Sequence, residues 1–286
     1  MKKIMRLFSC QIVMIMLITT VYACTNSKNV EKDDFGDAVM ELVKLSGQAE
    51  DFEEAKGKMI PAMMEYNKAL LAPESADRGD ALAQQFLDEN FEDEIMKPVF
   101  VSMFKGKITT EEIKEIIEKL QTEEGRRHNE HFSAINKKLP EIMANIGEVD
   151  PSNPAKTEYT CPDEYAQKFA QYYKGGFLAK SMDSAIDMIK GLAALNPEAN
   201  GEQMQAIESL IKFMEENFPI QMANAAYGTL TDEDLDFGIG LNKMPAYRKY
   251  VDSFDMKEIV TAAAQLGTSI GDTYKEWLSK QNVKLK

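Results

Sequence analysis

The sequence predicts an all-α fold, a multi-helix bundle made of two related helical halves. Apolar residues recur at spacings of three and four along nearly the whole chain, and the period-two alternation of half-buried strands is absent. Thr109-Thr110-Glu111-Glu112 and Thr231-Asp232-Glu233-Asp234 each have the pattern of a capped helix start. The two segments lie 122 residues apart within a longer stretch that repeats. Periodicity, caps and repeat therefore indicate the same fold class.

The first half of the chain is expected to be helical up to a linker. Apolar spacing predicts helices over residues 39–47, 52–71, 81–104 and, with interruptions, 109–146. We expect Pro61 to bend the second helix and Pro98 to interrupt the third, because proline lacks the N–H that a helix interior uses. Residues 147–161 hold two prolines and no regular period, which predicts a linker.

The second half is expected to be helical as well. Apolar spacing predicts helices over residues 162–195, 201–227, from 231 onward, and 255–279. Gly175-Gly176 should loosen the first of these, and Pro219 lies inside the second. Cys161 stands just before the first, ahead of Pro162 and two carboxylates that suit a helix start, so we interpret it as structural rather than as a reactive thiol.

The N-terminus has the pattern of an export signal. A basic start at residues 2–6 precedes the apolar run Ile12–Ile18, and the segment closes on Val21-Tyr22-Ala23-Cys24. Cysteine after a small residue resembles the bacterial lipoprotein box, in which Cys24 is lipidated. We therefore predict a signal peptide over 1–23, a polar tether over 24–35, and a protein anchored by lipid in the bacterial cell envelope, at the outer membrane on its periplasmic or surface face. A plain signal peptide and a single anchor helix are the alternatives.

Charge excludes one class of partner. Removing Lys2, Lys3 and Arg6 with the signal segment leaves 30 of the 33 basic residues against 47 acidic ones, a net charge of −17. Such a surface repels the phosphates of nucleic acids, so we expect no nucleic-acid partner. The expected partners are the membrane, through the lipid on Cys24, and an envelope protein or an apolar ligand.

An offset of 122 residues aligns two segments without a gap. Gly106–Ile113 falls on Gly228–Leu235, Arg126-Arg127 falls on Arg248-Lys249, and Phe132 falls on Phe254. Shared capping rules explain one matching helix start, but not the preceding glycine, the basic pair and the aromatic residue together. We therefore predict a duplication, with helical module 1 over 36–146 and helical module 2 over 162–282.

The repeated element resembles a family of exported bacterial helical proteins, domain of unknown function 2059. The matching residues of the first copy are Thr109, Glu111, Glu112, Ile113 and Gly125-Arg126-Arg127. Those of the second are Thr231, Glu233, Asp234, Leu235, Pro245-Ala246 and Arg248-Lys249. The Phe-Tyr pair of the family pattern is absent from both copies. The resemblance implies an all-helical exported module and brings no catalytic residues.

The basic pairs and the histidines are the candidate site residues. Candidates for binding an acidic partner are Arg126, Arg127, Arg248 and Lys249, although pairing with neighbouring carboxylates of the same chain is the simpler interpretation. His128 and His131 are spaced to share a helix face, and zinc is bound by such pairs. Two adjacent arginines oppose a cation and the spacing is not His-Glu-x-x-His, so we predict neither a metal nor another cofactor.

Gly238-Ile239-Gly240 lacks the third glycine and the preceding strand of a dinucleotide site. We expect these glycines to let another helix approach closely.

These observations favour an interaction or binding module of the envelope over the alternatives. The main alternative is a hydrolytic or metal-dependent enzyme that uses carboxylates or His128 and His131. A purely structural role is the third. Enzyme ranks below binding because no catalytic constellation stands out in the sequence.

Overall fold

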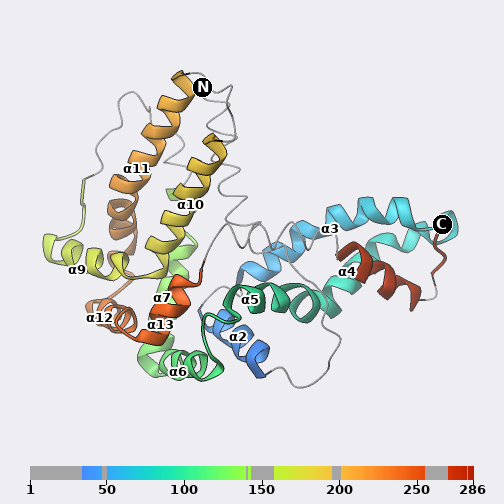
Figure 1. Ribbon diagram of the computed structural model, residues 1–286, viewed down its shortest axis with the longest axis horizontal. Coiled ribbons are helices and arrows are strands. Elements are labelled where there is room, and N and C mark those ends of the chain that lie inside the picture. The colour runs from blue at the N-terminus through green and yellow to red at the C-terminus, as the bar shows by residue number, and fades with distance from the viewer. Residues whose placement is uncertain are drawn as a thin grey trace. The chain divides into compact units, whose positions relative to one another are not determined.

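The computed structural model describes residues 34–46, 50–139, 141–142, 158–194, 201–254, 270–281 and 283–286. Over these ranges the chain is built from helices, with isolated β-bridges at Leu71–Leu285 and Tyr227–Leu230 (Figure 1). The predicted all-α class is confirmed. The predicted signal peptide, Cys24, the tether up to residue 33 and most of the predicted linker lie outside the described residues.

The described chain forms two compact units. Unit 1 comprises Lys107–Lys257 with Leu45–Gly47, and unit 2 includes Gln48–Gly106, Glu258–Lys286 and the segment up to Lys44. Both copies of the repeated motif belong to unit 1, whereas the sequence placed them in separate modules, 36–146 and 162–282. The difference arises because helices of one motif pack on helices of the other.

Unit 1 contains the repeated motif and most of the long helices. Its helices are α6 (Thr110–Leu120), α7 (Glu123–Asn136), α9 (Asp163–Lys174), α10 (Phe177–Ala194), α11 (Gly201–Ala226), α12 (Asp232–Leu241) and α13 (Pro245–Asp252). Helix α12 packs on α7 and α9, α13 packs on α6, and α10 and α11 pack on each other and on α9 (Figure 1). The apolar stripe of α6 shows why it is buried on one side, because Ile113, Ile116, Ile117 and Leu120 all lie in the core.

One predicted helix of unit 1 is two helices. Residues 162–195 were expected to form a long helix loosened at Gly175-Gly176, and the chain breaks fully at these glycines, because α9 ends at Lys174 and α10 begins at Phe177. The side chain of Asn242 lies against Gly175, where an added Cβ would be 3.1 Å from the Asn242 Cβ. The same side chain donates from Nδ2 to the Tyr172 carbonyl at 2.8 Å and so satisfies an acceptor that the end of α9 leaves open. The break is therefore stabilised from a distant helix.

Unit 2 consists of helices around an aromatic cluster. Its elements are α2 (Asp34–Leu45, up to Lys44), α3 (Glu50–Leu70), the 3₁₀ helix η1 (Pro73–Arg78), α4 (Gly79–Asn90), a π-helical turn (Phe91–Met96), α5 (Lys97–Phe104) and helical residues 270–279. Phe86 packs against Tyr274 and Trp277 with ring centroids 4.8 and 5.6 Å apart. The predicted interruption near Pro98 is this π-helical turn, which ends two residues before the proline.

No described helix combines the length and apolar character that a bilayer span requires.

Candidate functional site

The two motif segments fold alike at their helix starts. Thr109 and Thr231 are the N-caps of α6 and α12, and each caps through a box with the acid three residues later. In the first box the Glu112 N–H donates to Thr109 Oγ1 at 3.2 Å, and the Thr109 N–H donates to Glu112 Oε2 at 3.0 Å. In the second, Asp234 replaces Glu112, with 3.3 and 2.9 Å for the same two bonds.

The glycine ahead of each cap also has the same geometry. Gly106 and Gly228 have φ angles of +78° and +81°, a region that L side chains avoid. The positions lie 122 residues apart, as do the caps. Local geometry therefore agrees with the aligned sequences, while common descent of the two segments stays a prediction.

Each acid of a capping box also pairs with a base from the other motif. Arg127 on α7 donates from Nε to Asp234 Oδ1 at 3.0 Å, and Lys249 on α13 pairs with Glu112. Arg127 and Lys249 are themselves 122 residues apart, so the two ion pairs are reciprocal. They connect α7 with α12 and α13 with α6, which are pairs of packed helices. We call these contacts the α7–α12 junction and the α6–α13 junction.

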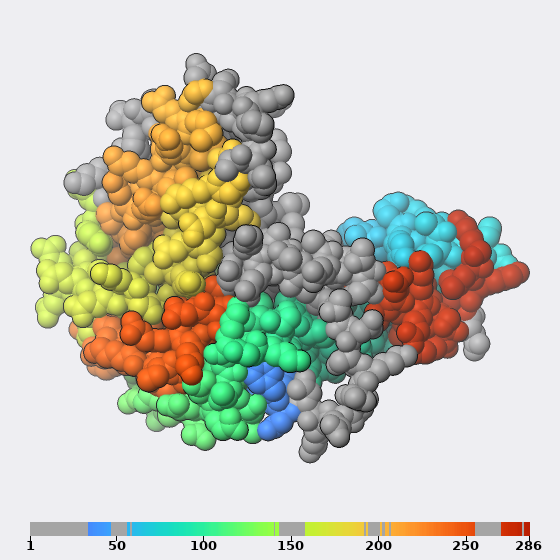
Figure 2. All heavy atoms as spheres, in the orientation of Figure 1, coloured from blue at the N-terminus to red at the C-terminus, as the bar shows by residue number. Residues whose placement is uncertain are grey.

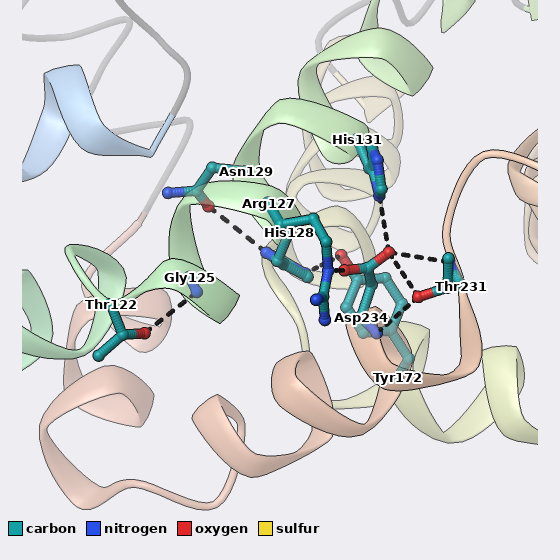
Figure 3. A network of polar contacts seen from close by, with 9 residues as sticks. All are labelled: Thr122, Gly125, Arg127, His128, Asn129, His131, Tyr172, Thr231 and Asp234. Carbon is teal, nitrogen blue, oxygen red and sulfur yellow. Dashed lines mark hydrogen bonds and ion pairs between the residues drawn. The ribbon is translucent and has the colours of Figure 1, made fainter.

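Asp234 is the centre of the α7–α12 junction (Figure 3). Its side chain is fully buried and accepts four hydrogen bonds, from the N–H and hydroxyl of Thr231, from Arg127, and from His131 Nδ1 at 2.7 Å. Burial by itself would raise the pKa of this carboxyl, but the bonds from Thr231, His131 and Arg127 hold it well below its usual range. Three of these bonds end on Oδ2 and one on Oδ1, and the side chain has no exposed surface, so the carboxylate is held by structural contacts and is not open to solvent.

His128 occupies an apolar cage next to this network. Its ring is buried, with Nε2 3.2 Å from the Tyr172 hydroxyl and Nδ1 3.4 Å from Asn129 Oδ1. The rings of Phe237 and Phe132 lie 5.3 and 6.1 Å from it, centroid to centroid. Burial lowers the pKa of His128, so the ring is neutral at pH 7.

The two histidines therefore have different partners, although both lie on α7. His131 orients toward a carboxylate and His128 toward a tyrosine hydroxyl (Figure 3). In the part of the chain that the structure describes, no three His, Cys, Asp or Glu side chains are grouped so that they could hold a metal ion.

Helix α9 reaches this site through Tyr172, which packs over Gly238 of α12. A Cβ added at Gly238 would lie 2.2 Å from Tyr172 Cε2 and 3.1 Å from His128 Nε2. The predicted close approach is thus confirmed for Gly238. It is wrong for Gly240, where an added Cβ would meet nothing within 4 Å.

The four basic candidates fall into two kinds. Arg127 and Lys249 are engaged in the reciprocal ion pairs, as the alternative interpretation of the sequence had it. Arg126 and Arg248, again 122 residues apart, are exposed on α7 and α13. Binding of an acidic partner by these two arginines stays a prediction. Cys161 is buried ahead of α9, and burial raises the pKa of its thiol, which makes it a poor nucleophile.

A second feature of unit 1 is an open groove between α10 and α11, which lie side by side in Figure 2. Its volume is about 660 Å³. Four apolar residues line it, namely Ala193, Met204, Ile207 and Ile211. Its charged residues are Lys190, Glu208, Lys212, Glu215 and Glu216.

Sequence reasoning missed Tyr172 and the role of Asp234. The 122-residue offset held the signal, because it places Glu112 on Asp234 and Arg127 on Lys249, one acid and one base in each copy. Nothing in the sequence pointed to Tyr172.

Comparison of the chain with protein-family models, with curated proteins and with solved structures finds no match. The resemblance to domain of unknown function 2059 stays a prediction.

Proposed function

We propose that this protein is a lipid-anchored component of the bacterial cell envelope that acts by binding an amphipathic helix of a partner protein. The sequence pattern that ends at Cys24 supports the location in the cell envelope. The groove between α10 and α11 is the observation that carries the binding function.

The apolar residues of the groove suit a helix. Met204, Ile207 and Ile211 follow one another at spacings of three and four, so they form a stripe over two turns of α11. All three are partly exposed. A helix that lays its own apolar stripe along such a row buries both, which is a recurrent mode of peptide recognition.

The charged residues of the groove favour basic flanks on that helix. Three glutamates face two lysines, and the lysines are matched by Glu215 at 3.8 Å from Lys190 and Glu216 at 4.0 Å from Lys212. Glu208 is exposed and adds negative charge. Lysine or arginine beside the apolar stripe of the partner would therefore complement the rim.

Catalysis is supported less well by the polar network. An aspartate that orients a histidine is a feature of hydrolytic sites, and Asp234 does hold His131. Such a site also needs a nucleophile within reach of the histidine. Among the described residues, His131 hydrogen-bonds to Asp234 and to no hydroxyl or thiol. The polar groups of the network bond to one another instead.

The test is site-specific photo-crosslinking in cells that express the full, anchored protein. A benzoylphenylalanine replaces Ile207 or Ile211 in the groove, and Glu118, exposed on α6, serves as the matched control position. We expect an adduct from the groove positions and none from the control. Adducts of equal yield at all three positions, or none at the groove, would refute the proposal.

The identity of the adduct decides the kind of ligand. We expect a protein whose crosslinked peptide is an amphipathic helix with basic flanks. A synthetic peptide of that segment should bind the purified protein, and Ile211→Asp should weaken binding at least tenfold. A lipid adduct in place of a protein adduct would mean that the groove binds an apolar ligand and not a helix. Separately, Cys24→Ala should abolish incorporation of a labelled fatty acid, and retained labelling would refute the predicted anchor.

A further inference from the structure

Both histidines of the chain lie at one of the two reciprocal junctions. His128 and His131 stand on α7 at the α7–α12 junction. At the positions 122 residues later, on or just after α13 at the α6–α13 junction, the chain has Tyr250 and Ser253. The two junctions have similar caps and similar ion pairs, but only one contains histidine, the residue type whose ordinary pKa lies nearest to neutral pH.

We infer that the α7–α12 junction, together with α9, which packs on α12, is an acid-sensitive latch. The three helices stay packed at neutral pH and separate more often in mild acid. The α6–α13 junction does not respond. The inference concerns the junction alone and does not depend on the groove or its ligand.

The cage of His128 favours the neutral ring. Its nitrogens face the hydroxyl of Tyr172 and the amide oxygen of Asn129, and the aromatic rings of three helices surround it. At neutral pH the tyrosine hydroxyl can donate to Nε2. A proton on Nε2 would reverse this bond, so that the hydroxyl accepts and its own proton loses the ring as a partner. It would also place a charge among apolar rings, which is costly unless the charge is paired.

The charged groups around His128 do not compensate for this charge. From α7, Arg127 and His131 face the same region and repel a second positive charge, and from α12 only Asp234 attracts it. Asp234 already accepts four hydrogen bonds, and α9 contributes the uncharged Tyr172. Helices α9 and α12 are also joined by the ion pair Lys168–Asp236 at 2.9 Å, which is solvent-exposed on its acidic side.

The sign of the effect follows from linkage. Burial lowers the pKa of His128 in the folded junction below that of an open chain, which is about 6.5. The open junction therefore takes up more protons, so the closed form loses stability as the pH falls below about 6.5. Asp234 does not contribute to this response, because its lowered pKa keeps the carboxylate charged and its ion pair with Arg127 intact at pH values far below 6.5.

Opening would separate Tyr172 from Gly238 and expose the rings of α9 and α12. The largest possible response is set by a histidine that has its ordinary pKa of about 6.5 in the open junction and takes up no proton in the closed one. Between pH 7 and 5 the open population then rises by about twenty-five-fold.

The test is hydrogen exchange by mass spectrometry on the full mature protein at pH 7 and 5, corrected for the intrinsic pH dependence of exchange. We expect peptides from α9 and α12 to exchange faster at pH 5, by up to about twenty-five-fold, with no change in peptides from α6 and α13. Equal acceleration in both junctions would show general acid unfolding and overturn the latch. No acceleration in either would overturn it as well.

Two variants assign the response to one ring. His128→Gln keeps a side chain that can hydrogen-bond but cannot titrate, and it should abolish the acid response. His131→Gln is the matched control and should keep it. The opposite pattern would overturn the inference.

Should His128→Gln fail to fold, the wild-type protein still provides the answer. An NMR titration of the ring of His128 should give a pKa below 6.5, and a value at or above 6.5 would overturn the latch.

Discussion

Gly238 offers a sensitive test of how α9 is seated on α12, because a single methyl group there meets a buried ring. The closest contacts of an added Cβ would be 2.2 and 2.5 Å, to two ring carbons of Tyr172. Carbon atoms in proteins pack at about 3.5–4.0 Å, so the ring would have to move by more than about 1 Å. Tyr172 is buried and its hydroxyl contacts His128, so the movement disturbs both packing and a hydrogen bond.

The expected magnitude for Gly238→Ala combines three contributions. Alanine in place of glycine stabilises a helix by about 1 kcal/mol. Overpacking a core costs about 1–3 kcal/mol, and the lost hydrogen bond costs about 1 kcal/mol. The free energy of unfolding should therefore fall by about 1–3 kcal/mol.

Gly240→Ala is the matched control on the same helix. Gly240 is exposed and an added Cβ meets nothing within 4 Å, so this change should stabilise by about 0.5–1 kcal/mol. Urea unfolding followed by far-UV circular dichroism measures both variants. If Gly238→Ala is as stable as Gly240→Ala, Tyr172 does not pack on Gly238 and the description of the site is wrong. The double variant Gly238→Ala with Tyr172→Leu should recover part of the loss, which a double-mutant cycle quantifies.

Further expectations concern the two junctions and unit 2. Asp234→Asn should lower the free energy of unfolding by about 3 kcal/mol, since it leaves Arg127 beside a buried neutral group. Glu112→Gln should leave the urea midpoint nearly unchanged, because the Lys249–Glu112 pair is solvent-exposed. Equal losses would contradict this distinction. The pKa of Asp234 is lowered in the folded state, so its contribution is complete above about pH 4 and is lost in stronger acid; wild type and Asp234→Asn should therefore converge in stability below pH 4 when urea midpoints are measured across pH. In unit 2, Asn67→Leu should cost about 2–3 kcal/mol, because it leaves the buried hydroxyl of Tyr274 without its partner at 2.8 Å, and a change within 0.5 kcal/mol would refute the role of this bond.

The helix starts illustrate what local sequence can predict. Thr109 and Thr231 cap their helices through contacts with residues three positions later. A contact of that range can be predicted from four consecutive residues. The two glycines at 175 and 176 indicated a weak point in the helix but not a complete break. The break involves Asn242, which is 67 and 66 residues away in the chain from the two glycines that it contacts.

The basic residues show what local sequence cannot predict. Pairing with carboxylates of the same chain was one of two interpretations of Arg127 and Lys249, but neighbours on the same helix would have been the first choice. Their actual partners are 107 and 137 residues away. The histidine pair was similar, since a spacing of three places both rings on one side of α7 without saying that one meets a carboxylate and the other a tyrosine.

The sequence by itself determined the all-α class, the capped starts of α6 and α12 and the close approach of another helix at Gly238. These follow from periodicity, capping and the absence of a side chain, all of which act within a few residues. Only the tertiary structure decided that the two motifs share one unit, that each capping acid pairs with a base of the other motif, and that Tyr172 closes over His128. Those contacts depend on which helix faces which, and many arrangements of amphipathic helices bury the same apolar stripes.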